Sequence, residues 1–386
     1  MKDKVVIFGS TGSIGKNALS VIRESKDKFK VIGLCVNKDI NTLYGQIKEF
    51  RPLSVCVRDE NKARELKKRL RRGIKFFSGQ KGIEEFSSIK TDISLVAISG
   101  ISSLKPLLIA IANSKRIALA NKESIVTAGS LVFKRAKSFN TQILPVDSEI
   151  NALFQLIEAR GGRVCRDDFR KVYLTASGGA LAGYSKKELT KVGIRKVLAH
   201  PTWKMGKRVT IDSATLVNKG FEVVETHHFF GLDYQKIGIV LHKESVIHAF
   251  LECKDNTLFA CLYPPDMKMP ISHALYYPKR VNSKKEVNFK SSFSYSFRPI
   301  NYKDYPMLDI ILRAAEREDN SLAILNAVDE VAIDYFLKGK IKFIDIYKVM
   351  AYIFRNYKSS KIKRIGDVFF WDDWGRRKTE EYLNKL

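Results

Sequence analysis

Residues 5–15 read Val5-Val6-Ile7-Phe8-Gly9-Ser10-Thr11-Gly12-Ser13-Ile14-Gly15 and decide the fold. Four apolar residues predict a buried strand, and three glycines follow it directly, ahead of a helical pattern at Lys16–Glu24. A strand–turn–helix of this kind lets the backbone approach a pyrophosphate, and the helix N-terminus supplies N–H groups and a favourable dipole. The stretch therefore predicts a dinucleotide-binding turn.

Two alternatives compete for the same glycines. A P-loop requires four residues between its glycines and a Lys-Ser or Lys-Thr pair, whereas five residues separate Gly9 from Gly15, and Asn17 follows Lys16. A purely structural glycine turn remains the other alternative. The GxxGxxG spacing is a variant typical of NADP-type oxidoreductases.

The end of the second predicted strand bears on the choice of cofactor. NAD-binding units usually carry an acidic residue there to bind the ribose hydroxyls. This chain has Asn37 and Lys38 instead, and an amide and a cation accommodate a 2′-phosphate, which favours NADP. Asp39 follows immediately and weakens that preference.

Alternation of strands and helices predicts the architecture of the first half of the chain. Continuous apolar strands separated by helices indicate a doubly wound, Rossmann-type α/β fold with a parallel sheet. The expected strands are Val5–Phe8, Val31–Val36, Ser54–Val57, Ile93–Ile98, Ile117–Ala120 and Ile143–Pro145. A helix is expected at Ser124–Lys137.

Beyond Pro145 the alternation ends, which predicts a central α+β domain followed by a small helical C-terminal domain. A long helix is expected near Ser213–Phe229, and the last helix at Thr379–Leu386. We expect a cofactor-binding domain at 1–147, a catalytic metal- and substrate-binding domain at 148–277, a linker at 278–305 and a helical domain at 306–386.

Composition bounds the class of protein. The 386 residues carry 68 Lys and Arg against 41 Asp and Glu, a formal net charge of +27, and 45% are hydrophobic, as in a folded globular protein. No stretch reaches the ~20 apolar residues of a membrane span, and the N-terminus lacks a secretory signal pattern, so we expect a cytoplasmic protein without a membrane partner. Five widely spaced cysteines without a CxxC pair predict neither disulfides nor a thiolate zinc site.

The positive charge is compatible with nucleic acid, acidic membranes or phosphorylated small molecules. Its densest run, Lys62–Lys75, has no interleaved aromatic residues, so we interpret it as a solvated helix face rather than a nucleic-acid stripe. We expect no nucleic-acid partner. A nucleic-acid protein remains the competing binding class, and it would show affinity that falls steeply with salt.

Carboxylates in two segments predict a metal site. Asp147 and Glu149 follow the last strand of the first domain, and at i and i+2 of an extended chain they would point to the same side. Such oxygen ligands suit Mg²⁺ or Mn²⁺. Glu222 is the candidate third ligand.

The segment that contains Glu222 also predicts a phosphate site. On a helix Asn218 and Lys219 share one face with Glu222, and together with Ser213 they could hold a phosphate. The alternative is a solvated helix face. Upstream, Ser177 is followed by two glycines at a strand end, which leaves room for a ligand.

A non-periodic segment, His200–Lys207, combines a tryptophan, a methionine and cations between Pro201 and Gly206. A lone tryptophan usually belongs to a core, yet in such a loop it can serve as a lid that excludes water. The histidines form no HExxH motif and no GxSxG is present, which excludes zinc-protease and serine-hydrolase patterns.

Seven motifs in collinear order resemble the 1-deoxy-D-xylulose 5-phosphate reductoisomerase family. They are GSTGSIG (9–15), LANKES (119–124), PVDSE (145–149), TASGG (175–179), HPTWKMGKR (200–208), DSATLVNKGFE (212–222) and PPDM (264–267). The resemblance implies an NADPH- and Mg²⁺- or Mn²⁺-dependent enzyme of isoprenoid precursor biosynthesis, active as a homodimer. Its phosphorylated sugar substrate would be rearranged to an aldehyde and then reduced to 2-C-methyl-D-erythritol 4-phosphate.

The resemblance also implies roles for individual residues. The catalytic group comprises Lys122, Asp147, Glu149, Glu222 and His200, and the metal ligands are Asp147, Glu149 and Glu222. Substrate contacts fall on Ser148, Ser177, His200, Trp203, Met205, Ser213, Asn218 and Lys219. Cofactor contacts fall on Thr11, Gly12, Ser13, Ile14, Asn37, Lys38, Asn121, Glu123 and Met267.

Two points of the resemblance stay open at this stage. Asp39 departs from the family's pattern near the expected 2′-phosphate. Another NADP-dependent Rossmann oxidoreductase acting on a phosphorylated carbonyl compound remains the alternative enzyme, although it leaves the Ser177, Ser213, Asn218 and Lys219 set unexplained.

Overall fold

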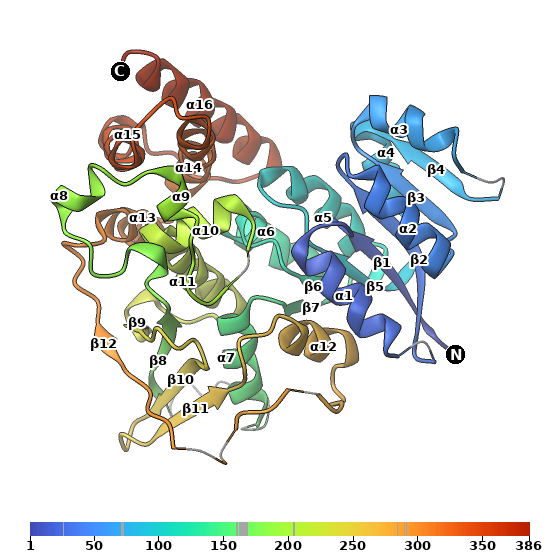
Figure 1. Ribbon diagram of the computed structural model, residues 1–386, viewed down its shortest axis with the longest axis horizontal. Helices are drawn as coiled ribbons and strands as arrows, with labels where there is room; N and C mark the ends of the chain where they lie inside the picture. The colour runs from blue at the N-terminus through green and yellow to red at the C-terminus, as the bar shows by residue number, and fades with distance from the viewer. Residues whose placement is uncertain are drawn as a thin grey trace. The chain divides into compact units, whose positions relative to one another are not determined.

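The computed structural model describes residues 1–25, 27–70, 73–159, 161, 169–203, 205–283, 285–288, 290 and 292–386 (Figure 1). The chain divides into two compact units. Unit 1 comprises residues 1–124, 132–151 and 266–284, and unit 2 comprises 125–131, 152–265 and 285–386. Each unit has its own sheet.

Unit 1 is built on a seven-stranded parallel sheet in the order β4-β3-β2-β1-β5-β6-β7, which confirms the doubly wound fold class. Its strands are β1 (Asp3–Phe8), β2 (Phe29–Val36), β3 (Ser54–Val57), β4 (Lys75–Ser78), β5 (Thr91–Val96), β6 (Ser114–Leu119) and β7 (Gln142–Pro145). The strand order reverses between β1 and β5, and ligands of open α/β sheets bind in the crevice at the carboxyl ends of the strands at such a point.

Helices connect these parallel strands. They are α1 (Ser13–Arg23), α2 (Ile40–Phe50), α3 (Glu60–Lys67), α4 (Gly79–Ser87), α5 (Leu104–Ile111) with the 3₁₀ turn η1 (Ile101–Ser103) before it, and α6 (Glu123–Ser138). Helix α12 (Lys268–Tyr276) returns late in the chain to pack on α1. Helix α7 (Ser148–Ala159) leads out of unit 1.

Unit 2 combines a five-stranded mixed sheet, in the order β11-β10-β8-β9-β12, with a helical core. Its strands are β8 (Phe169–Ala176), β9 (Ile237–Leu241), β10 (Ile247–Cys253), β11 (Leu258–Leu262) and β12 (Arg298–Pro299). Its longer helices are α10 (Lys207–Thr215), α11 (Val217–Phe230), α13 (Pro306–Glu316), α14 (Ser321–Leu337), α15 (Phe343–Asn356) and α16 (Ile365–Leu383). Short turns complete it: η2 (Gly179–Leu181), α8 (Lys186–Leu189), α9 (Ile194–Val197) and η3 (Tyr234–Lys236).

The long helix expected near Ser213–Phe229 is wrong, because Leu216 breaks it into α10 and α11. Leu216 has φ of 58°, a left-handed conformation that costs a non-glycine residue about 1–2 kcal/mol. Its side chain is buried with Ala176 and Leu308, and this packing between distant segments offsets the local cost.

Three further expectations need correction. Strand β4 and helix α12 were missed. The last helix starts at Ile365 rather than Thr379, because Gly375 in its middle weakens the helical signal.

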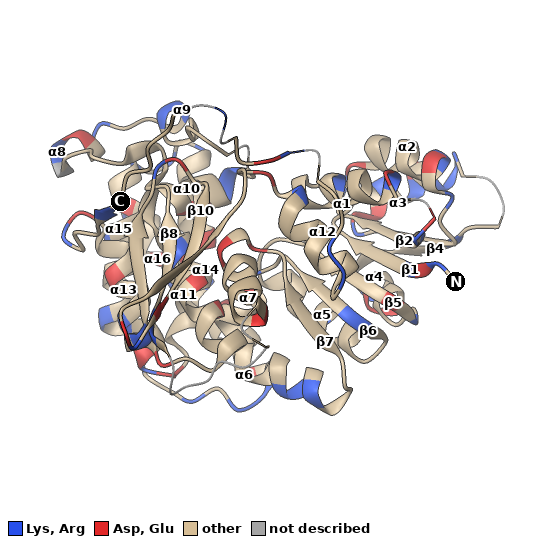
Figure 2. Cartoon of the chain, turned by 90° about the horizontal axis from the view of Figure 1, so that it is seen from below, with Lys and Arg blue, Asp and Glu red and all other residues tan. Residues whose placement is uncertain are grey.

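The helix expected over the basic run at 62–75 ends at Lys67. Figure 2 shows Lys and Arg beside Asp and Glu in this part of unit 1, and Lys62 pairs with Glu65 at 2.7 Å. Arg71 and Arg72 lie outside the described residues.

Two composition-based expectations can be compared with the described residues. Among the described residues no disulfide joins Cys35, Cys56, Cys253 or Cys261, and Cys165 lies outside the description. Within the described chain, no helix has both the length and the apolar character needed to cross a bilayer.

The core of unit 1 predicts a sharp difference between two phenylalanines. Phe86 is fully buried and packs edge-on against Phe8 (ring centroids 5.4 Å apart) and Phe77 (5.8 Å). We expect Phe86→Ala to lower the free energy of unfolding by about 3–5 kcal/mol. Phe139→Ala, at a side chain that is 49% exposed, should cost less than about 1 kcal/mol. Denaturant unfolding monitored by circular dichroism measures both, and equal losses would contradict this assignment of the core.

Candidate active site

The glycine turn of unit 1 is held by close backbone approaches. The N–H groups of Gly9 and Ser10 donate to the carbonyl of Cys35 at 2.8 and 3.0 Å. Gly9 has φ of +82°, and a Cβ placed on it would lie 2.5 Å from the carbonyl oxygen of Ala97. A Cβ on Gly15 would lie 2.4 Å from the carbonyl oxygen of Gly9. The turn therefore accepts no side chain at either position.

A buried glutamine on α2 fixes the turn from behind. Ser10 Oγ donates to Gln46 Oε1 at 2.7 Å, and Gln46 Nε2 donates back to the Ser10 carbonyl at 2.9 Å. Sequence reasoning missed Gln46, although a polar residue between the buried Leu43 and Ile47 was an available signal.

Helix α1 begins after Gly12 without a side-chain cap, at the mouth of the turn. The predicted residues Thr11, Gly12, Ser13 and Ile14 are exposed or half-buried there. First-turn N–H groups of a helix have no intrahelical partner and favour negatively charged oxygens. This end of α1 is therefore suited to a pyrophosphate.

Asn37 and Lys38 are exposed at the carboxyl end of β2, as expected for groups that recognise a 2′-phosphate. Asp39 caps α2 by accepting a hydrogen bond from Thr42 N–H at 3.1 Å. The departure from the family's pattern thus has a local structural role.

Arg58 brings a second cation to this strand end and was missed in the sequence. Its N–H donates to the carbonyl of Val36 at 3.0 Å, and that of Asp59 donates to Asn37 at 3.0 Å, so the β2–β3 ladder continues beyond the strands. Arg58 is exposed beside Asn37 as a result.

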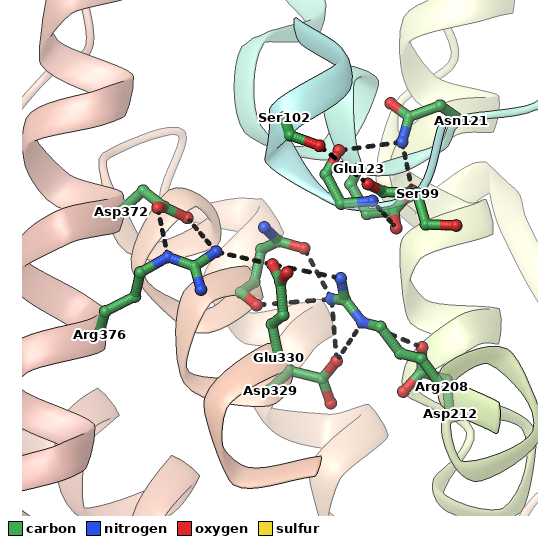
Figure 3. Close-up of polar contacts among 12 residues, drawn as sticks. Ser99, Ser102, Asn121, Glu123, Arg208, Asp212, Asp329, Glu330, Asp372 and Arg376 are labelled. Carbon is green, nitrogen blue, oxygen red and sulfur yellow. Dashed lines mark hydrogen bonds and ion pairs between the residues drawn. The ribbon is translucent and has the colours of Figure 1, made fainter. Parts of the chain in front are cut away.

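Asn121 and Glu123 are buried in a network with the loop after β5 (Figure 3). Asn121 Nδ2 donates to the Gly100 carbonyl at 3.2 Å and to Glu123 at 2.8 Å, while Glu123 accepts the Gly100 N–H at 2.7 Å. These contacts fix the loop beside β1. A direct contact of either side chain with a cofactor stays a prediction.

The carboxylates of unit 1 lie at the start of α7. Asp147 Oδ1 accepts the N–H of Glu149 at 3.1 Å, and Asp147 Oδ2 accepts Lys122 Nζ at 2.8 Å. Ser148 Oγ donates to Glu149 at 2.6 Å. The extended chain expected at this position is wrong, because Ser148 and Glu149 form the first turn of a helix whose N-terminus stabilises negative charge.

Glu222 is the third candidate ligand and belongs to unit 2. It is 1% exposed, and both Asn218 Nδ2 and Lys219 Nζ donate to its carboxylate. The three side chains share one face of α11, as the spacing predicted. The solvated-face alternative is wrong, since Lys219 and Glu222 are both buried.

The other residues predicted to bind phosphate in unit 2 lie around the turn after β8. The Nε2 atom of His200 lies 3.0 Å from the Oγ atom of Ser177. Gly179 packs so closely on α10 that a Cβ would lie 2.7 Å from the backbone of Ser213. Ser177, His200 and Ser213, which the sequence spreads over 36 positions, are thus brought together by β8, the turn and α10.

The hydrogen bonds of His200 determine its tautomer. Its Nδ1 accepts the N–H groups of Thr202 (3.1 Å) and Trp203 (2.9 Å). An atom that accepts two N–H groups carries no proton, so Nε2 is protonated and donates to Ser177. Burial lowers the pKa of His200 below its ordinary value of 6.5, which keeps the ring neutral.

The remaining predicted residues are half-buried. The Trp203 ring centroid lies 6.4 Å from that of His248, and Met205 follows in the same segment. Lys204 lies outside the described residues. Met267 precedes the first residue of α12 in unit 1.

The parallel sheet and its glycine turn, together with the carboxylates of both units and the hydroxyl, amide and ammonium groups of unit 2, are typical of a Rossmann-type NADPH-dependent oxidoreductase. Three family models match: 1-deoxy-D-xylulose 5-phosphate reductoisomerase at residues 5–129, its C-terminal domain at 143–230, and the DXP reductoisomerase C-terminal domain at 262–378. The chain belongs to the 1-deoxy-D-xylulose 5-phosphate reductoisomerase family.

Individual proteins support this assignment over the whole chain. The reductoisomerase of Thermodesulfovibrio yellowstonii is 41% identical over 385 residues, covering 99% of this chain and 100% of that protein. That of Caldanaerobacter subterraneus is 40% identical over 371 residues, 96% of each chain. The solved structure of the Zymomonas mobilis reductoisomerase in complex with NADPH has a TM-score of 0.91 at 32% identity, covering 100% of both chains. A DOX-P reductoisomerase in complex with NADPH, fosmidomycin and magnesium has a TM-score of 0.91 at 31% identity, covering 99% of this chain and 98% of that one.

The environment of His200 predicts how it titrates. Protonation of Nδ1 would break both hydrogen bonds from Thr202 and Trp203, so it should occur only below pH 6.5. The pKa of His200 is lower in the folded chain than in the unfolded chain. The stability that the neutral ring contributes is therefore fully present above the unfolded pKa, and it is lost as pH falls through the folded pKa. Nitrogen-15 NMR of the His200 ring should show an Nε2-protonated neutral tautomer at pH 7. A ring that is protonated at Nδ1, or that titrates above 6.5, would contradict the assignment.

Proposed function

We propose that this chain converts 1-deoxy-D-xylulose 5-phosphate to 2-C-methyl-D-erythritol 4-phosphate, using NADPH and a divalent cation, Mg²⁺ or Mn²⁺. The proposal is carried by one observation, which is that the similarity to the reductoisomerase family extends over the whole chain. The isomerisation would produce an aldehyde, and NADPH would then reduce it.

NADPH would bind at the carboxyl edge of the unit 1 sheet. Residues 11–14 would hold the pyrophosphate, while Asn37 and Lys38 would hold the 2′-phosphate, aided by Arg58. Asn121 and Glu123 would position the cofactor, and Met267 would pack near the nicotinamide.

Asp147, Glu149 and Glu222 would hold the cation. Their carboxylates suit a hard ion, and in each unit an ammonium group already balances one of them, Lys122 at Asp147 and Lys219 at Glu222. The cation, when bound, would act as a Lewis acid on the carbonyl and hydroxyl oxygens of the substrate. Lys122 and Ser148 would orient the sugar backbone.

The substrate phosphate would bind to unit 2. Ser177, Ser213, Asn218 and Lys219 would donate to it, and His200 would hold Ser177 in place through Nε2–H. Trp203 and Met205 would cover the substrate and exclude water, which strengthens the electrostatic interactions of a closed site.

Three expectations about the whole protein accompany this proposal. They are the boundaries between a cofactor domain at 1–147, a catalytic domain at 148–277, a linker at 278–305 and a helical domain at 306–386; assembly as a homodimer; and a cytoplasmic location. The resemblance to the family supports them.

The first experiment is a spectrophotometric assay of NADPH oxidation with 1-deoxy-D-xylulose 5-phosphate. We expect oxidation that requires the substrate and is abolished by a chelator and restored by Mg²⁺ or Mn²⁺. Formation of 2-C-methyl-D-erythritol 4-phosphate is checked by mass spectrometry. A folded protein that binds NADPH but does not oxidise it would overturn the proposed reaction.

Glu149→Gln tests the proposed metal ligands. The substitution removes a charged ligand in unit 1 and leaves the glycine turn intact, so kcat should fall on the order of 100-fold or more while the Kd for NADPH changes little. Glu65→Gln, on the exposed side of α3, is the control and should change neither quantity. Retained turnover in Glu149→Gln would place the metal on other residues.

Asp39→Asn tests cofactor selection. Asparagine caps a helix as well as aspartate, so the free energy of unfolding should change by less than about 0.5 kcal/mol. Loss of a negative charge beside Lys38 should lower the Kd for NADPH severalfold and that for NADH less. Fluorescence titration measures both, and Asp27→Asn, which removes an exposed charge elsewhere in unit 1, is the control. Equal changes for the two nucleotides would count against a 2′-phosphate site at Lys38.

A further inference from the structure

Asn151, in the first turn of α7, is fully buried and connects α7 to two other elements of unit 1. Its Nδ2 donates to the carbonyl of Pro145, at the end of β7, at 2.8 Å. The same Nδ2 lies 3.1 Å from Nδ1 of His273, on α12. One amide group thus bridges the carboxyl edge of the parallel sheet and a helix that follows 122 residues later in the chain.

The neighbours of Asn151 fix the direction of both hydrogen bonds. A backbone carbonyl only accepts, so the atom that bonds to Pro145 is the amide nitrogen and not the amide oxygen. That nitrogen carries two hydrogens, of which one is donated to Pro145 and the other to His273. Nδ1 of His273 is therefore an acceptor without a proton. Burial lowers the pKa of His273 to about 4, and the charges of Arg280 and Arg116 add to this effect, so the ring is neutral at pH 7.

The hydrogen bond to Pro145 closes the turn that carries two of the proposed metal ligands. Asp147 and Glu149 lie between Pro145 and Asn151 in the sequence. The N–H of Asn151 donates to the carbonyl of Asp147 at 2.9 Å, while its side chain reaches back to Pro145. The conformation of the 145–151 turn, and with it the placement of the two carboxylates, therefore depends on Asn151.

The hydrogen bond to His273 acts on α12, which begins directly after Met267. His273 follows Met267 by six residues, which is about 9 Å along a helix. The same part of α12 is held by Arg116, whose Nη1 donates to the carbonyl of Leu275 at 3.1 Å, and α12 also packs on α1. Because a short helix moves as one body, the position of Met267 depends on these contacts.

We propose that Asn151 is a positioning residue for the reaction, because it links the 145–151 turn to α12. Asn151 acts through Asp147 and Glu149 on one side and, by way of His273, through Met267 on the other. The inference rests on the proposed function, which supplies the metal ligands and the place of the nicotinamide. Its consequence is that one buried amide affects both the binding of the cation and the transfer of hydride.

Two substitutions separate the two links. Asn151→Leu keeps the approximate size of the side chain and removes both donors, so it should disturb the turn and α12 together. His273→Phe keeps a ring on α12 and removes only the acceptor, so it should disturb α12 while the bond between Asn151 and Pro145 stays. His273→Asn is the conservative variant, since its Oδ1 can accept in place of Nδ1.

Binding of Mn²⁺ reports on the turn without any turnover. We expect Asn151→Leu to raise the Kd for Mn²⁺, measured from the electron paramagnetic resonance signal of the free ion, about tenfold or more. His273→Phe leaves the bond to Pro145 in place and should keep this Kd within about twofold of the parent value. Asn113→Leu is the matched control, because it removes an amide that donates to the carbonyl of Ile109 at 2.9 Å, before the first residue of β6 and so at the opposite end of the parallel strands. It should lower Tm and leave the Kd for Mn²⁺ unchanged.

The hydride step reports on α12. Asn151→Leu and His273→Phe should each lower kcat about tenfold, because a small displacement of a group beside the nicotinamide slows the transfer. NADPH with deuterium at the transferred position should give a larger isotope effect on kcat in both variants than in the parent chain, since hydride transfer then limits the rate more. His273→Asn should restore kcat to within about threefold of the parent value. Asn113→Leu should change neither kcat nor the isotope effect.

Two results would each overturn the proposed link. One is a Kd for Mn²⁺ in Asn151→Leu that equals the parent value, and the other is an unchanged kcat and isotope effect in His273→Phe. Nitrogen-15 NMR of the parent chain tests the hydrogen bond itself, even where Asn151→Leu does not fold. The His273 ring should be the Nε2-protonated neutral tautomer at pH 7, and a ring protonated at Nδ1 would contradict the link.

Failure of the proposed function gives a different result. A parent chain that binds Mn²⁺ and NADPH but does not turn over 1-deoxy-D-xylulose 5-phosphate would contradict the proposed reaction. The Kd values for Mn²⁺ and the tautomer of His273 would still decide whether Asn151 holds the turn and bonds to α12.

Discussion

Negative charge held away from water is the constraint on which the functional parts of this chain depend. A buried carboxylate is costly unless cations or N–H groups surround it. Asp147 meets this requirement with Lys122 and the start of α7, and Glu222 meets it with Lys219 and Asn218. In unit 1, Glu123 meets it with Gly100 and Asn121. Each acid is oriented by the groups that balance its charge.

This constraint also explains why the proposed site can be ready for a cation and a phosphate. The carboxylates of Asp147 and Glu222 are paired with ammonium groups on flexible stems, which can turn towards a substrate when another cation takes over the charge balance. The backbone donors need no such movement, because hydrogen bonds and close backbone packing already hold the glycine turn in place. Binding would therefore reorganise a few side chains rather than the fold.

Short-range patterns predicted much of this structure. The run from Val5 to Gly15 predicted β1, the turn and α1, because strand burial and glycine spacing act over a few residues. The spacing of Asn218, Lys219 and Glu222 predicted their shared face for the same reason. The resemblance to the family supplied residue roles that no local pattern contains, and those roles stay predictions until they are tested.

By itself the sequence determined the parallel fold of unit 1, its glycine turn, the types of donor group and the family. Only the tertiary structure decided where contacts between distant residues override the local preference for a helix or a strand. Leu216 breaks a continuous helical pattern because its side chain packs against Ala176 and Leu308. Gln46 fixes the turn from another helix, and Arg208 collects acids from segments more than a hundred residues apart. These features depend on contacts between distant parts of the chain and on the cost of buried charge, and neither leaves a periodic signal in the sequence.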